Sequence, residues 1–187
     1  MFDKNGEGTI FLSYSQEDDE TASQLVSLLE FNGIRLIWDK HDLDYGDSLG
    51  LFMKTGRYTP CSILLVSDNY LTSRSCMHEV CEMMEEEDFA RRVRPMILKS
   101  ADVFSLEGRI RYIQYWDKEY RNLSKNIQGI SAPETAVELW RELDRLGRIR
   151  CRIDPFLAYL SDRYSCTTVT QFVAELSKEA GRGARAV

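Results

Sequence analysis

The sequence predicts an α/β protein with a central parallel sheet of about five strands and helices on both faces. Apolar segments typical of strands, at 9–14, 34–38 and 61–66, alternate with segments whose apolar residues recur at helical spacing. The connections between strands are long enough for a crossover helix, which parallel strands require. The alternation of strand and helix therefore indicates a sheet that is covered by helices on either side.

The first strand is expected at Thr9–Tyr14, where β-branched and aromatic residues stop at a polar loop. A helix follows over 20–32, because its apolar residues form one stripe and Gly33 supplies a stop. The second strand is 34–38, and the third, Cys61–Val66, is almost entirely apolar, which indicates burial on both faces. The remaining expected elements are a helix over 48–58, a loop and helical region over 67–87, a strand over Val93–Leu98 and a short fifth strand over Ile113–Trp116.

The C-terminal third reads as a helical elaboration. One helix is expected to begin near Pro133 and end at Gly147, and a last helix to run over 168–181. We expect a single domain over 9–180, with a flexible arm at 1–8 and a flexible tail at 181–187.

Composition restricts the classes of function. The chain has 187 residues, of which 43% are hydrophobic and 29% charged, the balance of a globular protein. Its net charge of −6 argues against nucleic-acid binding, which depends on basic residues. It contains no apolar run long enough to span a membrane and no apolar leader. Five cysteines at irregular spacing indicate reduced thiols, so we expect a cytoplasmic protein without a metal site.

Four segments resemble the motifs of the TIR domain family, in the family's order and spacing. The resemblance covers about residues 8–125, and it implies a flavodoxin-like TIR fold. The stretch 126–165 has no clear counterpart and reads as a family-specific insertion. The matching segments are Ile10–Ser15, Trp38-Asp39 with Leu43–Asp47, Ile63–Leu71, and Ser73–Glu79 with its S-x-x-C-x-x-E pattern; Tyr115–Asp117 adds a late turn.

The resemblance implies an enzyme. Many bacterial TIR domains cleave NAD between nicotinamide and ribose, and the family's catalytic glutamate maps onto Glu79. NAD is then the substrate, and no cofactor is implied. The ribose becomes oxocarbenium-like as nicotinamide departs, and a carboxylate beside it stabilises that charge. From the residues alone, Glu79 opens an acidic run that is typical of a solvated helix face. His78 is expected at the surface and Cys76 in the core.

Other candidate residues surround Glu79 in this interpretation. Candidate substrate contacts are Tyr14, Ser15, Trp38, Asp39 and Ser75, the last standing where the family has tryptophan. For Tyr14 the alternative is an aromatic residue that closes the core, and for Asp39 a loop cap. The loop after the second strand is implied to contact a neighbouring TIR domain, so self-association is expected; its named residues are Tyr45, Gly46 and Asp47. For Gly46 the alternative is an ordinary turn glycine, and for the loop as a whole it is a solvated, charged segment.

These implications lead to one preferred function and several alternatives. The preferred function is production of a cyclic ADP-ribose-type signal in antiphage defence, as in Thoeris systems, with a separate effector protein as its reader. The alternatives are an effector domain that depletes NAD within a larger system, a bacterial effector that acts in host cells, and an adaptor that only assembles with other TIR domains. Release of nicotinamide distinguishes the enzymes from the adaptor.

Overall fold

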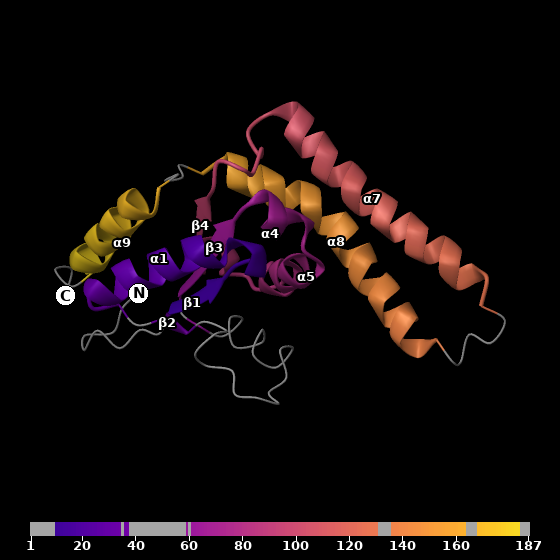
Figure 1. The fold of residues 1–187 in the computed structure, drawn as a ribbon, viewed down its shortest axis with the longest axis horizontal. Helices are drawn as coiled ribbons and strands as arrows, with labels where there is room; N and C mark the ends of the chain where they lie inside the picture. The colour runs from indigo at the N-terminus through magenta and orange to yellow at the C-terminus, as the bar shows by residue number, and fades with distance from the viewer. Residues whose placement is uncertain are drawn as a thin grey trace.

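A computed structural model describes residues 10–34, 36–37, 59, 61–130, 136–163 and 168–183, and Figure 1 shows its fold. A four-stranded parallel sheet lies at its centre, in the order β2-β1-β3-β4. The strands are β1 (Ile10–Ser13), β2 (Leu36–Ile37), β3 (Cys61–Val66) and β4 (Val93–Ile97). The helices are η1 (Gln16–Asp18), α1 (Asp19–Phe31), α4 (Asp68–Thr72), α5 (Arg74–Met83), α6 (Phe89–Arg92), α7 (Leu106–Gln128), α8 (Val137–Ser161) and α9 (Val169–Gly183).

The strands form where the apolar runs predict them. In β1 and β3 every residue but Cys61 is buried, as expected for inner strands with helices on both sides. The register pairs Ser13 with Leu64 on β3, and Val66 with Ile97 on β4. The carboxyl ends of the strands therefore meet at one edge, which is where ligands bind in open α/β sheets.

Helices cover both faces of the sheet, as predicted. On one face of the sheet, α1 and α9 pack their apolar sides against Ile10, Leu12 and Ile63, which are alternate strand residues that point to that face. Gly33, with a φ of 76°, follows α1 in the left-handed conformation that ends helices. On the other face α4, α5, α7 and α8 enclose Phe11 and the rest of the larger core.

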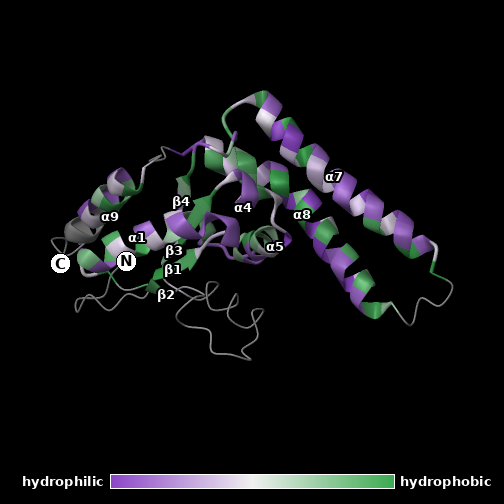
Figure 2. Cartoon of the chain, in the orientation of Figure 1, coloured by the Kyte–Doolittle hydropathy of each residue, from purple (hydrophilic) through white to green (hydrophobic). Residues whose placement is uncertain are grey.

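The two long helices α7 and α8 form a hairpin that projects from the sheet on the side opposite α9 (Figure 1). Figure 2 shows polar and apolar residues alternating along both helices, whereas the strands are almost entirely apolar. The second half of α8 nevertheless lies in the core, because Ile153, Phe156 and Leu157 are fully buried there. The hairpin is thus anchored in the domain at one end and exposed at the other.

The fifth strand expected at Ile113–Trp116 is wrong: these residues lie inside α7. Tyr112 and Trp116 are four residues apart and both are almost fully buried, so they form one helix face. The indole Nε1 of Trp116 donates to the carbonyl of Leu71 at 2.9 Å, which fixes α7 against α4. A four-residue apolar segment is compatible with a strand or with one turn of a helix, and here tertiary packing favours the helix.

Three helix boundaries also differ from the expectation. Gly147 does not end a helix, because α8 continues through it to Ser161. The loop and helical region expected over 67–87 contains two helices, with Ser67 and Ser73 as their N-caps, and the second of them ends at Met83. The predicted arm at 1–8, the helix at 48–58 and Pro133 lie outside the described residues. No helix in the described part of the chain has the length and apolar character needed to cross a bilayer.

Candidate functional site

The candidate site lies at the carboxyl edge of the sheet, where β1 and β3 end side by side. Ser67 follows β3 and caps α4, because its hydroxyl accepts a hydrogen bond from the backbone N–H of Tyr70 at 2.9 Å. Ser73 caps α5 in the same way, accepting from the backbone N–H of Cys76 at 3.4 Å. These caps determine where α5 begins and so which of its residues face the end of β1.

Glu79 lies on the face of α5 that contacts β1. Cys76 and Glu79 are three residues apart, so both point in this direction. The Glu79 side chain is only 5% exposed, although it belongs to an acidic stretch of sequence. The Ser13 hydroxyl donates a hydrogen bond to Glu79 Oε2. The alternative of a solvated helix face is therefore wrong for Glu79.

A chain of three polar groups ends at this carboxylate. The Ser13 and Tyr70 hydroxyl oxygens lie 2.9 Å apart. A hydroxyl has one proton, and the O–H of Ser13 donates its hydrogen bond to Glu79, so Ser13 accepts the hydrogen bond from Tyr70. Burial raises the pKa of Tyr70 well above its usual value, and the charge of Glu79 raises it further. Tyr70 therefore stays protonated as the donor, and the chain runs from Tyr70 through Ser13 to Glu79.

Asp18 ties the loops after β1 and β3 together. The Ser67 hydroxyl donates to Asp18 Oδ2, and the amide of Asn69 donates to Asp18 Oδ1 at 3.4 Å. Both contacts join residues about fifty positions apart in the sequence. They hold the rim of the sheet next to the Glu79 chain.

Cys76 is a buried core thiol, in agreement with its predicted role. Its Sγ lies 3.5 Å from the carbonyl oxygen of Tyr14. Burial raises the pKa of the thiol to about 12, so Cys76 remains protonated at neutral pH. A protonated, enclosed thiol is a poor nucleophile, so Cys76 is not a candidate for the reacting group.

The predicted substrate contacts occupy different environments. Tyr14 and Ser15 follow β1 at the rim and are 9% and 7% exposed. The Tyr14 hydroxyl donates to Asp19 Oδ1 at 3.4 Å. Ser75 is exposed in the first turn of α5. The backbone carbonyl of Tyr14 thus contacts Cys76, on the face of α5 that also carries Glu79. Ser75, by contrast, presents its side chain to solvent.

Five predicted residues lie outside the described part of the chain. Two were expected to contact substrate and three to contact a neighbouring domain, and all follow β2. They are Trp38, Asp39, Tyr45, Gly46 and Asp47.

Sequence reasoning did not identify Ser13, Tyr70 and Asp18 as site residues. Ser13 carried a usable signal, since it is a polar residue at the carboxyl end of an otherwise apolar strand. Tyr70 and Asp18 carried none, because their roles depend on partners that are distant in the sequence.

His78 does not belong to the Glu79 site, and it predicts a pH-dependent stability. Its side chain is half-buried near Glu82, Arg145, Arg148 and Glu142 of the α5–α8 contact. Burial lowers its pKa below the ordinary value of 6.5. The unfolded chain therefore takes up a proton more readily, and the folded state loses stability as the pH falls below about 6.5.

We expect the free energy of unfolding to fall between about pH 7.5 and 5.5, and the His78→Gln variant to show a smaller fall. One such group changes the free energy of unfolding by at most about 1.4 kcal/mol for each pH unit. Urea unfolding at three pH values, with wild type and variant compared at each, measures it. Equal slopes for the two proteins would contradict the prediction.

Comparisons with known proteins agree with this fold. The family model described as "TIR domain" matches residues 10–127. The chain is 34% identical over 79 residues to TMV resistance protein N of Nicotiana glutinosa, an alignment that includes 41% of this chain. Among solved structures it resembles the TIR domains in the structure of the activated Roq1 resistosome, which directly recognises the pathogen effector XopQ. That match has a TM-score of 0.59 at 18% identity and covers 93% of this chain and 99% of the other.

Each of these two matches supports only a limited conclusion. The alignment spans 7% of the length of the tobacco resistance protein, so that likeness concerns one segment of a much larger protein. The match to the Roq1 structure concerns the fold, at 18% sequence identity.

Proposed function

Because the chain belongs to the TIR domain family, we propose that it cleaves NAD at the bond between nicotinamide and ribose, with Glu79 as the catalytic residue. The observation that supports this most is the burial of the Glu79 carboxylate at the carboxyl edge of a parallel sheet, with Ser13 donating to one of its oxygens. A carboxylate held in a water-poor site acts strongly on a nearby positive charge.

The reaction requires one bond to break and one to form. The electron pair of the N-glycosidic bond goes to the nicotinamide nitrogen, which neutralises the pyridinium, and the ribose is left as an oxocarbenium ion. The negative charge of Glu79 stabilises that ion. Water then attacks the anomeric carbon and loses a proton to give ADP-ribose, or a nucleophilic atom of the same molecule attacks and gives a cyclic product.

We expect the cyclic product, a nucleotide signal for a separate effector protein. Glu79 is 5% exposed, and a site that excludes water favours attack by an atom already held in place over attack by water. A role in defence, for which we propose phage as the target, is supported by the names of the two similar proteins, a virus resistance protein and a resistosome component.

Self-association is part of the proposal. The similar structure is of TIR domains within a resistosome, which is an assembly. Specific activity is therefore expected to rise with protein concentration.

The test is mass-resolved chromatography of NAD incubated with the purified protein at high concentration, with Glu79→Ala as the matched control. Loss of NAD in the wild type alone supports the proposal, and the product mass separates the cyclic nucleotide from ADP-ribose, which contains one more water. If NAD survives in both at concentrations where the protein self-associates, the chain is an adaptor and Glu79 is a structural acid.

Ser13 is expected to orient the Glu79 carboxylate in this reaction. Ser13→Ala removes the hydrogen bond to Oε2, and we expect kcat to fall about tenfold while KM for NAD changes little, since a charged hydrogen bond contributes about 1.5 kcal/mol. Tyr70→Phe, which leaves that bond in place, should have a smaller effect. Steady-state kinetics of both variants measures this, and a change in KM alone would refute the orienting role.

A further inference from the structure

The contacts of Asp18 and the hydrogen-bond chain that ends at Glu79 meet at one side chain, Ser67. Ser67 is fully buried, and its hydroxyl accepts a hydrogen bond from the backbone N–H of Tyr70 at 2.9 Å. The same hydroxyl donates to Asp18 Oδ2. A hydroxyl has one proton, so Asp18 receives the one hydrogen bond that Ser67 can donate. Ser67 therefore connects the rim of the sheet to the residue at which the Glu79 chain begins.

Three side chains lie between the carboxylates of Asp18 and Glu79, and we call this series of contacts the Asp18–Glu79 path. Its inner members are 0%, 0% and 3% exposed, and they are Ser67, Tyr70 and Ser13. The path leaves Ser67 through the backbone of Tyr70 and continues from the Tyr70 hydroxyl to Ser13. A buried polar group that loses its partner has no water to turn to, so the orientation of each member depends on the next.

The position of Tyr70 depends on how Ser67 caps α4. Tyr70 lies in the first turn of this short helix, and the cap determines where that turn begins. Without Asp18, the Ser67 hydroxyl turns toward another acceptor, and the lone pair that receives the Tyr70 N–H turns with it. A change at Asp18 is therefore expected to move the Tyr70 hydroxyl relative to Ser13.

The two ends of the path differ in their access to solvent. Glu79 is 5% exposed, whereas Asp18 is partly exposed at the rim and also accepts from the side-chain amide of Asn69 at 3.4 Å. Burial is the main cause of the raised pKa of Cys76, and the charges of Glu79 and Asp18 both add to it. Both carboxylates therefore lie near one thiol, and a direct electrostatic effect of Asp18 on Glu79 has to be separated from an effect along the path.

We propose that Asp18 is a positioning residue for Glu79 and that it acts along the Asp18–Glu79 path. The proposal rests on the proposed function, in which the Glu79 carboxylate stabilises the oxocarbenium ion. A fixed charge is effective in this role only when its oxygens are held in place before the reaction. The path allows a partly exposed residue at the rim to set the orientation of a buried carboxylate.

The kinetic test is a double-mutant cycle between Asp18 and Ser13. Asp18→Ala is expected to lower kcat about threefold with little change in KM for NAD, because it removes an orienting contact and not a substrate contact. Asp18→Asn keeps an oxygen that accepts from Ser67 and should recover most of the loss. In the Ser13→Ala background the path is already broken, so Asp18→Ala should then leave kcat nearly unchanged.

A second readout needs no reaction. The carbon-13 NMR resonance of the Glu79 carboxyl carbon, assigned by its absence from Glu79→Gln, reports the environment of that group. We expect Asp18→Ala to shift this resonance in the otherwise wild-type protein and not in the Ser13→Ala background. If the wild type cleaves no NAD, the proposed function fails, and the resonance still decides whether Asp18 positions Glu79.

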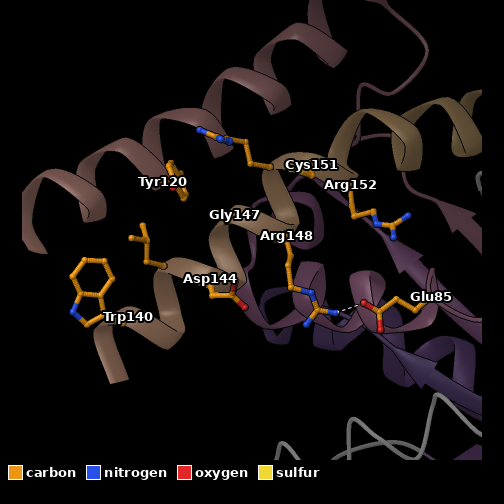
Figure 3. Close-up of a pocket in the computed structure, with 10 residues that line it drawn as sticks. Glu85, Tyr120, Trp140, Asp144, Gly147, Arg148, Cys151 and Arg152 are labelled. Atoms are coloured by element: carbon orange, nitrogen blue, oxygen red, sulfur yellow. Dashed lines mark hydrogen bonds and ion pairs between the residues drawn. The ribbon is translucent and has the colours of Figure 1, made fainter. Parts of the chain in front are cut away.

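Arg148→Gln is the control for a general loosening of the helix that carries Glu79. Figure 3 shows Arg148 reaching from α8 to Glu85, beside a groove of about 680 Å³ that no member of the path lines. Arg148 also pairs with Glu82 of α5 at 2.7 Å, so the substitution removes two ion pairs without touching the path. We expect a lower melting temperature with unchanged kcat and an unchanged Glu79 resonance.

Three results would overturn the proposal. The first is an equal loss of kcat from Asp18→Ala with and without Ser13→Ala, which indicates a direct effect of the charge. The second is a rise in KM alone, and the third is an Asp18→Asn variant as impaired as Asp18→Ala. If Asp18→Ala does not fold, Ser67→Ala removes the same hydrogen bond from the other side and takes its place in the cycle.

Discussion

Glu79→Gln is expected to lower the rate of NAD cleavage by about a hundredfold to a thousandfold without unfolding the protein. Glutamine keeps the size of the side chain and an oxygen that accepts from Ser13, but it removes the negative charge. Electrostatic stabilisers of a charged transition state contribute to rates on this scale. The measurement is the initial rate of nicotinamide release, with KM determined separately.

The stability of the same variant separates a catalytic role from a structural one. A buried carboxylate is costly to desolvate, so its replacement by the neutral amide should leave the free energy of unfolding the same or higher. A catalytic Glu79 predicts lost activity at retained stability. If Glu79→Gln instead lowers stability by several kcal/mol and leaves the rate unchanged, the carboxylate serves the fold.

Phe156→Ala is expected to destabilise the protein by about 3–5 kcal/mol, the cost of removing a buried aromatic ring from a packed core. Phe156 is fully buried in the second half of α8 and stacks on Tyr159 with ring centroids 6.5 Å apart. This part of the chain follows the segment that matches the family model, which ends at residue 127. Chemical denaturation measures the loss.

Leu139→Ala is the matched control, because Leu139 lies on the same helix and is 42% exposed. Its expected effect is within about 0.5 kcal/mol. The contrast tests whether α8 from Leu146 onward is part of the domain core while its first turns are not. Equal, small effects of both substitutions would show that α8 is a separable appendage.

The position of the candidate site follows from the sequence to a large extent. The apolar runs of β1 and β3 predict parallel strands, and the edge where they end is where such sheets bind ligands. The spacing of Cys76 and Glu79 predicts that both lie on one face of a helix. The hydrogen bond between Ser13 and Glu79 was not predictable, because it joins residues 66 positions apart.

The sequence by itself determined the class of fold, the order along the chain of strands β1 to β4, and the glutamate on which the proposed chemistry rests. These depend on local periodicity and on motifs, which a single chain displays directly. Tertiary structure alone decided that Ile113–Trp116 is helical, that Glu79 is buried, and that α8 passes through Gly147 to leave a groove. Burial and packing depend on contacts between distant segments, and a short apolar or acidic stretch is compatible with more than one outcome until those contacts form.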